Sequence, residues 1–408
     1  MKLNKDQTQL VMDLASFYYN PESQFFVLSG QAGVGKTTCM RFFAEQLLDL
    51  GHIKICMGGP TNKSTAVLAD AVANKDITFK TIYSVLGLRM MANGEFKELT
   101  DSGKDSIGNY DLVIIDEASM VSSTLIDYIK KKTALADTKV IFIGDKEQLP
   151  PVNETVSPIW TQFKVNYELT KVERHDNSIL KFVQHIRGNS EPFYKSPGDQ
   201  VFIQSEDDFI EKIKEFALNG EFHNGKAKAI AWRNVTVDFL NSYIRDNNPI
   251  TKSPDKFVPG DRIIFREPIF IGEKCIATTD EEGTVTDVTI TQHNLYPMLK
   301  AWRVKIRLDW TQSYVTAYII HDSSAKNLEI MLDEYKNTKK WHLFWKLKEA
   351  FNNIAYGYAL TAHRSQGSTF ERVFVDAGDI ELNRKISERV SCLYVACSRA
   401  SKELFIFP

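Results

Sequence analysis

The feature that most constrains the fold is a glycine-rich stretch at residues 30–37, which reads GQAGVGKT. It follows the apolar run 25–28 and precedes residues 38–48, where apolar side chains recur at helical spacing. A strand, a glycine loop and a helix in this order predict a phosphate-binding loop. The backbone N–H groups of such a loop close on a polyphosphate, and the positive N-terminal end of the helix faces that anion.

Individual positions of this loop have expected roles. Lys36 is expected to reach the β- and γ-phosphates of a nucleotide, and the Thr37 hydroxyl is expected to hold Mg²⁺. The other positions expected to contact the nucleotide are Gly30, Ala32, Gly33, Val34, Gly35 and Thr38. The alternative interpretation is a glycine turn with a surface lysine, but the strand before the loop and the helix after it argue against this.

The rest of the chain predicts an α/β protein with two similar domains. Apolar runs alternate with helical stretches, which is typical of a parallel sheet, and the pattern restarts beyond residue 160. Between residues 257 and 320 it gives way to short β-rich runs, separated by glycine, proline and acidic clusters. The domains are therefore expected at 1–160, at 161–256 with 353–408, and at 257–352, the last being a small β-barrel with a helical extension.

A β-hairpin is predicted within the first domain, over residues 85–109. Asn93-Gly94 is the strongest short hairpin turn signal, and it separates residues 86–92 from residues 95–100. Phe96 lies near the tip. The sequence leaves two interpretations open for Phe96: it separates nucleic-acid strands as part of a protruding pin, or it packs onto the parent domain.

Polar residues beyond the loop predict the rest of a nucleotide-hydrolysis site. Asp116 ends an apolar run and is expected to hold Mg²⁺ through water, while Glu117 could polarise the attacking water. The amide of Gln148 could bond a γ-phosphate. Arg174 and Arg399, the latter after a run that we interpret as a strand, could meet charge developing on that phosphate. For each arginine, a surface salt bridge is the alternative.

Composition excludes some classes of protein. The chain of 408 residues is 43% apolar and 25% charged, which is typical of a soluble globular protein. It has no run of eighteen apolar residues, and its five cysteines form no CxxC pair. We expect a cytoplasmic protein with no membrane contact. Because the formal net charge is −2, any nucleic-acid site must be a local groove.

Taken in order, the motifs resemble those of superfamily 1 helicases. They occupy residues 30–37, 59–63, 116–120, 144–152, 361–369 and the run that ends at Arg399. The forms GDxxQLPPV and HRSQGST resemble the RecD-like branch, which moves 5′→3′, and the overall layout is most similar to a phage member of it. The resemblance implies two RecA-like P-loop NTPase domains, with a hairpin inserted in the first and an SH3-like β-barrel in the second. It also implies an ATP-dependent DNA helicase or translocase that uses ATP and Mg²⁺.

The resemblance also assigns roles to single residues. Gln7 would read the adenine edge, Arg174 and Arg399 would contact the γ-phosphate, and Gln366 and Gly367 would lie near the phosphates. The residues that would contact the DNA strand are Pro60, Thr61, Asn62, Thr81, Thr361 and His363. Tyr83 stands where the branch usually has a histidine, and a tyrosine there could stack on a base.

The implied partners are single-stranded DNA and forked duplex DNA, with a single-strand-binding or replication protein as a further candidate. The chain is expected to act as a monomer in the cytoplasm of a bacterium or of a phage-infected host. Two other functions stay open: a single-strand translocase that mainly displaces proteins, and a nucleotide-switched nucleic-acid-binding protein. The paired arginines and Gln148 argue against the switch.

Overall fold

The computed structural model describes residues 3–90, 96–98, 107–134, 136–151, 154–170, 178–187, 194–271 and 274–408. The chain forms two compact units. The first comprises Met1–Ser205, Ile230–Trp232 and Thr361–Pro408, and the second comprises Glu206–Ala229 and Arg233–Leu360. Within the described ranges, no helix combines the length and the apolar character needed to cross a membrane.

The first unit contains a six-stranded, all-parallel sheet with the order β3-β2-β6-β7-β1-β8. Its strands are β1 (Phe25–Gly30), β2 (Ile55–Gly58), β3 (Ile77–Phe79), β6 (Leu112–Ile115), β7 (Lys139–Gly144) and β8 (Tyr167–Leu169). The predicted parallel α/β fold is therefore confirmed. Strand β8 pairs with β1, so this sheet continues past residue 160, where the sequence pattern seemed to restart.

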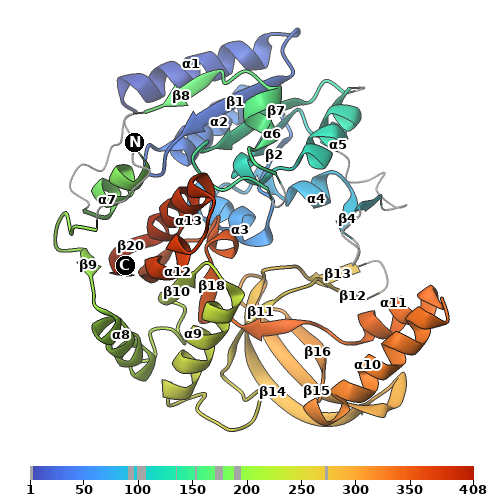
Figure 1. Cartoon of the computed structure of the whole chain (residues 1–408). Coiled ribbons are helices and arrows are strands. Elements are labelled where there is room, and N and C mark those ends of the chain that lie inside the picture. Colours follow the sequence, from blue (N-terminus) through green and yellow to red (C-terminus); the bar gives the residue numbers. More distant parts are fainter. Residues whose placement is uncertain are drawn as a thin grey trace. The chain divides into compact units, whose positions relative to one another are not determined.

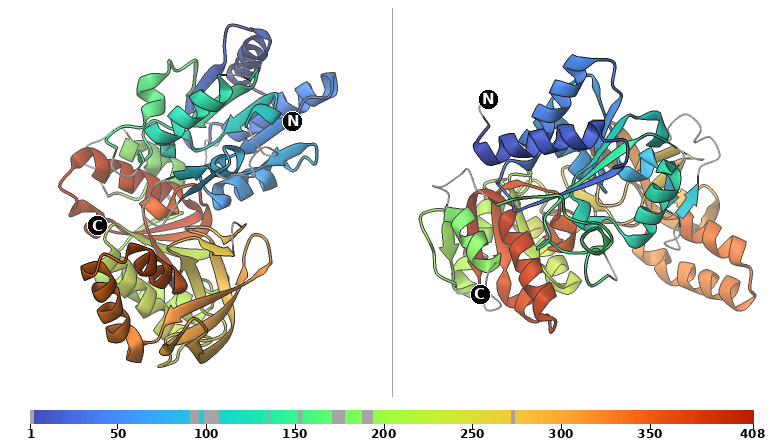
Figure 2. Two further views of the ribbon diagram at one scale, coloured as in Figure 1. Left: turned by 90° about the vertical axis from the view of Figure 1, so that its right-hand side faces the viewer. Right: turned by 90° about the horizontal axis from the view of Figure 1, so that it is seen from above.

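Helices cover both faces of this sheet (Figures 1 and 2). Phe26 and Leu28 point to one face and pack with helices α1 (Lys5–Tyr19), α2 (Lys36–Leu50) and α3 (Asn62–Val72). Val27 points to the other face and packs with helices α4 (Ile82–Val85), α5 (Ser123–Thr133) and α6 (Pro158–Gln162). Burial on both faces explains why the strand sequences are continuously apolar.

Two short strands carry the described part of the predicted hairpin. Strands β4 (Leu88–Met90) and β5 (Phe96–Glu98) pair antiparallel, with Met90 opposite Phe96. The predicted turn, Asn93-Gly94, lies outside the described residues.

A second sheet has the order β18-β10-β19-β20-β9. Its strands are β9 (Val201–Ile203), β10 (Ala227–Ala231), β18 (Ala359–Thr361), β19 (Phe370–Asp376) and β20 (Ala400–Phe407). Helices α7 (Ser178–Arg187), α12 (Ala377–Glu381) and α13 (Ile386–Ser398) contact strands of this sheet.

The strand predicted before Arg399 is wrong. Residues 386–398 form helix α13, and every side chain from Cys392 to Cys397 is buried. A short apolar run that is buried on all sides has no polar face, so periodicity cannot distinguish a helix from a strand there. Arg399 still follows the run directly, now as the residue that caps the helix.

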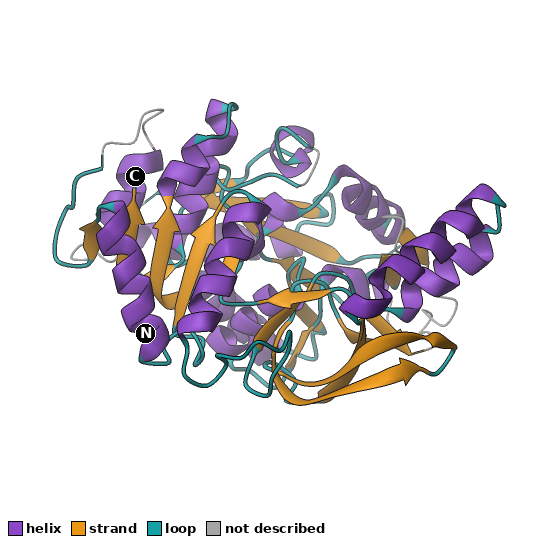
Figure 3. Ribbon diagram, turned by 60° about the horizontal axis from the view of Figure 1, so that its bottom comes forward, coloured by secondary structure: helices purple, strands orange, loops and turns teal. Residues whose placement is uncertain are grey.

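The second unit contains an antiparallel sheet with the order β16-β15-β14-β11-β17 (Figure 3). Its strands are β11 (Arg262–Phe265), β14 (Glu282–His293), β15 (Tyr296–Leu308), β16 (Tyr314–Ile320) and β17 (Ile354–Tyr356). The strands β12 (Ile269–Ile271) and β13 (Lys274–Ala277) pair with each other. The helices are α8 (Glu206–Leu218), α9 (Asn234–Asn247), α10 (Asp322–Asn337) and α11 (Trp341–Ala350). The last two pack on strand β15 around Leu299 and Ala301.

Candidate nucleotide-hydrolysis site

The phosphate-binding loop has the geometry that its sequence predicted. Strand β1 ends at Gly30, and helix α2 begins at Lys36 without a side-chain cap, so its first N–H groups face the loop. Gly33 and Gly35 have φ angles of +81° and +86°, a region that residues with a Cβ rarely enter. The Lys36 ammonium donates to the carbonyls of Gly30 (2.6 Å) and Gln31 (3.0 Å), which places the cation over the loop.

Gln7 lies directly against this loop although it is 27 residues from Val34 in sequence. Its Nε2 donates to the Val34 carbonyl at 3.2 Å, and its Oε1 accepts from the Asn4 N–H at 3.1 Å as part of a capping box. A Cβ at Gly35 would come within 2.6 Å of the Gln7 amide nitrogen. The helix α1 therefore brings a buried amide to the loop, and the role of Gln7 in reading the adenine edge stays a prediction.

Asp116 and Glu117 follow strand β6 and share one low-dielectric environment. The Asp116 Oδ1 accepts from the Glu117 N–H at 2.8 Å. Burial raises the pKa of Asp116, and the Lys36 ammonium partly offsets this. Burial, followed by the Asp116 charge, raises the pKa of Glu117, while Arg399 and Lys36 oppose the rise. These directions place both carboxyls within electrostatic reach of the loop lysine.

The backbone of Glu117 is strained. Its φ and ψ are 52° and 41°, in the left-handed region that costs a residue with a Cβ about 1–2 kcal/mol. A Cβ at Gly367 would lie 3.9 Å from the Glu117 Cγ, so the segment that contains Gly367 adjoins this carboxylate. Strain of this kind concentrates at functional sites, which supports a catalytic role for the glutamate.

Arg399 is buried at the end of helix α13, with 5% of its surface exposed. Its Nε donates to the Val395 carbonyl at 3.0 Å, and its Nη1 donates to the Ser368 carbonyl at 3.1 Å. Burial lowers the pKa of Arg399, and the Glu117 carboxylate is the leading influence that raises it. A buried guanidinium thus has its counter-charge on the predicted catalytic glutamate. Arg174 lies outside the described residues.

Two amide side chains also belong to the candidate hydrolysis site. The Gln366 Nε2 donates to the Leu149 carbonyl at 3.2 Å, so the segment that contains Gln366 reaches the GDxxQLPPV loop. Gln148, in that loop, is 8% exposed, and its Oε1 is buried without a hydrogen-bond partner among the described residues. Buried polar atoms normally have partners, so this amide fits a site that is completed by water or a ligand.

The donor set also fits a magnesium nucleotide. The described residues contain no cluster of three or more His, Cys, Asp or Glu side chains that could hold a metal ion by itself. Magnesium at a nucleotide site needs only one or two protein oxygens, because phosphates and water supply the rest. Thr37, at the start of helix α2, and Asp116 are the residues that could supply them.

Sequence reasoning missed three residues of this region. Asp145 is fully buried after strand β7, and the Tyr394 hydroxyl donates to its Oδ2 at 2.5 Å. The Nη2 of Arg187 lies 3.5 Å from the Asp145 Oδ1. Asp145 and Tyr394 belong to motifs that the sequence displays, which is the signal that could have found them, whereas Arg187 has no such signal.

Two of the predicted DNA-contacting threonines cap helices. Thr61 accepts from the Ser64 N–H at 3.0 Å at the start of α3, and Thr81 accepts from the Ser84 N–H at 3.3 Å at the start of α4. The Ile82 N–H donates to the Gly59 carbonyl at 3.0 Å, which joins the two loops. The other predicted contacts in this region are Pro60, which is buried, and Asn62, the first residue of α3.

Thr361 and His363 belong to a third segment that adjoins α3. Thr361 accepts from the Arg364 N–H at 3.3 Å, and the His363 Nε2 lies 3.8 Å from the Glu388 carboxylate. Burial lowers the pKa of His363. A Cβ at Gly367 would lie 3.0 Å from the Ser64 Cβ, so this segment meets the N-terminal end of α3.

Phe96 and Tyr83 pack against each other within the first unit. Their ring centroids are 5.7 Å apart, and Phe96 meets Tyr128 of helix α5 edge-on at 6.3 Å. Phe96 and Tyr83 are both partly buried against the apolar cluster on that face of the sheet, and burial raises the pKa of Tyr83. For Phe96, these contacts favour the packing interpretation.

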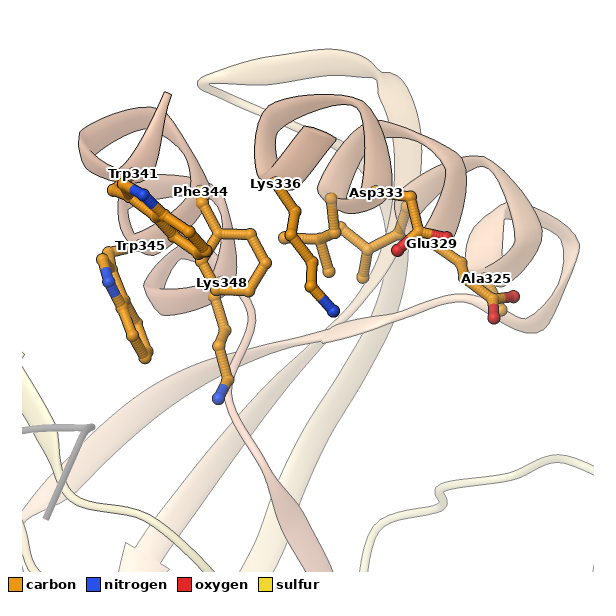
Figure 4. A pocket seen from close by; sticks show the side chains of 10 residues that line it. Ala325, Glu329, Asp333, Lys336, Trp341, Phe344, Trp345 and Lys348 are labelled. Atoms are coloured by element: carbon orange, nitrogen blue, oxygen red, sulfur yellow. The ribbon is translucent and has the colours of Figure 1, made fainter. Parts of the chain in front are cut away.

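The second unit contains a pocket between helices α10 and α11 (Figure 4). Its volume is about 530 Å³, and Trp341, Phe344 and Trp345 line one side, with Glu329 and Asp333 on α10 lining another. Trp341 is 49% exposed. The aromatic side chains at the start of helix α11 therefore line a surface pocket.

Comparison with known proteins identifies the family. The AAA domain family matches residues 2–210, and the UvrD-like helicase C-terminal domain matches residues 356–407. The ATP-dependent DNA helicase Dda of Enterobacteria phage T4 is 26% identical, with 93% of each chain covered. The RecD subunit of the RecBCD enzyme of Buchnera aphidicola is 30% identical, with 93% of this chain and 69% of that protein covered.

Solved structures show the same fold. A Pif1 helicase structure that concerns DNA unwinding at forked duplex DNA has a TM-score of 0.60 at 16% identity, with 100% of this chain and 92% of that chain covered. A Bacteroides Pif1 complex with ADP-AlF3 and single-stranded DNA has a TM-score of 0.56 at 16% identity, with the same coverage. The resemblance drawn from the motifs is confirmed. The chain belongs to the superfamily 1 helicases, in their Pif1/Dda-like group with an AAA domain, and is an ATP-hydrolysing enzyme.

Proposed function

We propose that the chain is an ATP-dependent 5′→3′ DNA helicase that couples ATP hydrolysis to movement along single-stranded DNA and to duplex unwinding. The observation that carries this proposal is the burial of Arg399 within the electrostatic reach of Glu117. A nucleotide switch needs only to bind its ligand, whereas a motor also needs a cation that meets charge developing during phosphoryl transfer.

The site residues have distinct proposed roles in hydrolysis. Lys36 binds the β- and γ-phosphates, Thr37 and Asp116 hold Mg²⁺, and Glu117 takes a proton from the attacking water. Magnesium supplies charge neutralisation at the phosphates when bound. Arg399 stabilises the transition state, and Arg174 is proposed for the same task. Gln148 bonds the γ-phosphate, Gln7 selects adenine, and Gln366 and Gly367 lie beside the phosphates.

The proposed track for DNA follows the loops that meet at helix α3. Thr61, Thr81 and Thr361 use their hydroxyls for local caps or turns, so we propose that backbone groups of these segments contribute the phosphate contacts. His363 contributes from the third segment. The T4 helicase among the relatives is a DNA helicase, and a Bacteroides Pif1 structure holds single-stranded DNA.

We retain the domain division as a proposal, with two RecA-like domains and an insertion at 257–352. The antiparallel sheet of the second unit supports an SH3-like assignment for that insertion. The hairpin of strands β4 and β5 is the proposed pin. We also propose a single-strand-binding or replication protein as a partner, and the monomer as the functional state. The proposed location is the cytoplasm. All five cysteines are free thiols, and free thiols persist in a reducing compartment of that kind.

One observation favours a second candidate function. Because Phe96 packs on Tyr83 and Tyr128, it is held against its own unit. A motor without an aromatic wedge could translocate and displace bound proteins while unwinding little.

Unwinding of duplexes with a 5′ tail, a 3′ tail or no tail separates these functions. The proposal expects ATP-dependent unwinding of the 5′-tailed duplex alone. Release of streptavidin from a biotinylated single strand without unwinding would favour the translocase. ATP hydrolysis that single-stranded DNA does not stimulate would contradict both and favour the switch. The same assays with the Lys36→Ala variant exclude a contaminating helicase.

A further inference from the structure

One buried carboxylate connects helices α7 and α13. Asp145 is fully buried, and its Oδ2 accepts from the Tyr394 hydroxyl of α13 at 2.5 Å. Its Oδ1 accepts from the Glu147 N–H at 3.2 Å and lies 3.5 Å from the Arg187 Nη2 of α7. No role proposed above uses this cluster.

The cluster around Asp145 also reaches the phosphate-binding loop. The Arg187 Nη1 donates to the Gln31 side-chain oxygen at 3.2 Å. Burial and the Asp145 charge raise the pKa of the Tyr394 hydroxyl, and the Ala32 backbone N–H opposes the rise, so this hydroxyl lies near the loop as well. Arg187 therefore bridges the loop residue Gln31 to the buried carboxylate that binds Tyr394.

The same helix carries the buried arginine. Tyr394 lies five residues before Arg399 along the chain, about 7.5 Å along the axis at the usual rise of an α-helix. Tyr394 is 1% exposed, and the side chains around it on α13 are buried, so the ring has little freedom to move. A contact that fixes Tyr394 therefore also fixes the position of Arg399.

We propose that Tyr394 is a positioning residue for ATP hydrolysis, whose hydroxyl, bonded to the buried Asp145 carboxylate, docks helix α13 beside the phosphate-binding loop and so presents Arg399 to the γ-phosphate. Arg187 supports the same arrangement from the Gln31 side. The inference rests on the role proposed above for Arg399. It adds to that role a specific contact through which the loop and the arginine depend on each other.

The chain offers a matched control in its second unit. Tyr358 is fully buried, accepts from the Arg262 N–H at 3.1 Å and donates to the Asp261 carboxylate at 3.4 Å. Its hydroxyl thus donates to a buried carboxylate as that of Tyr394 does, but none of its partners is a site residue. Removal of either hydroxyl should reduce stability, and only removal of the Tyr394 hydroxyl should affect catalysis.

The test compares Tyr394→Phe with Tyr358→Phe in the full chain, by melting temperature and by steady-state kcat and KM for ATP with oligothymidine present. Tyr394→Phe removes a hydrogen bond to a charged group. If the free energy of this bond helps to position Arg399 in the transition state, its loss should lower kcat by about tenfold to 100-fold. We expect its KM to stay within about threefold, and kcat of Tyr358→Phe to stay within about twofold, since neither change removes a phosphate contact. Equal kcat values for the two variants would overturn the inference.

A second comparison separates positioning from general damage. If Tyr394 acts through Asp145, adding Asp145→Asn to Tyr394→Phe should lower kcat by no more than about twofold beyond the worse single variant. Losses that multiply would overturn the inference. A wild-type protein without ATPase activity would overturn the proposed function itself, whereas an active wild type with an equally active Tyr394→Phe variant overturns only the role of Tyr394.

Discussion

Replacing Phe96 with alanine should lower the stability of the first unit and weaken all activities together. The ring takes part in two aromatic pairs, with Tyr83 and Tyr128. Each pair contributes about 0.5–1.5 kcal/mol beyond the area that it buries. The ring is only partly buried, so the burial itself adds about 1 kcal/mol, less than the value for a fully buried phenylalanine. The expected loss is about 2–4 kcal/mol.

The assay combines three measurements on one variant: the melting temperature, ATPase activity stimulated by single-stranded DNA, and unwinding of a 5′-tailed fork. A loss of this size should lower the melting temperature by about 4–16 °C in a unit of this size. ATPase activity and unwinding should then fall in parallel, in proportion to the folded fraction at the assay temperature.

Tyr128→Ala provides the control, because Tyr128 lies on helix α5 and not on the hairpin. If Phe96 is a packing residue, the double variant should lose less stability than the sum of the two single losses, by about 0.5–1.5 kcal/mol. An unchanged melting temperature with a selective loss of unwinding would refute the packing argument, and would show that Phe96 meets the fork.

Three further predictions concern the site and the track. Lys36→Ala should abolish ATP hydrolysis while single-strand binding survives, as measured by ATPase assay and fluorescence anisotropy; near-normal ATPase activity would contradict the site assignment. Because burial and the Asp116 charge raise the pKa of Glu117, kcat should fall on the acid side at a pH above the ordinary glutamate value of 4.5. Glu117→Gln should show very low kcat without that acid limb; an unshifted limb in the wild type would argue against Glu117 as the base. Single-strand affinity should fall with salt, with a log–log slope of about −0.7 per phosphate neutralised, although the net charge is −2; a slope near zero would exclude a basic groove.

The strand–loop–helix geometry of the candidate nucleotide site could be predicted from sequence because it depends on short, local patterns. The loop from Gly30 to Thr37 has one geometry compatible with its glycines, and Asp116 and Glu117 follow a strand that is recognisable by itself. The approach of Gln7 to the loop came from the resemblance alone, since a glutamine in a helix has no distinguishing pattern. Long-range contacts of this kind depend on packing that periodicity does not contain.

Other features could not be predicted, for physical reasons. Strand β8 pairs with β1 because that edge of the sheet is free. A strand of three residues is too short for its sequence to indicate which strand it pairs with. The second half of helix α13, from Cys392 to Cys397, is buried on every side and so has no polar face to reveal its period. Arg187 bonds Gln31 across 156 residues of sequence, and an arginine near a helix end is otherwise unremarkable. The DNA-contacting assignments and the domain boundaries stay predictions.

The conformation of Glu117 has a consequence for how this enzyme can change over time. Its left-handed backbone costs about 1–2 kcal/mol that a glycine there would recover. A glycine would also leave the buried Arg399 guanidinium without its leading counter-charge, so Glu117 and Arg399 hold each other in place. Selection for heat resistance alone therefore favours the joint loss of both charges, which yields an inactive motor, and only continued demand for movement keeps the pair.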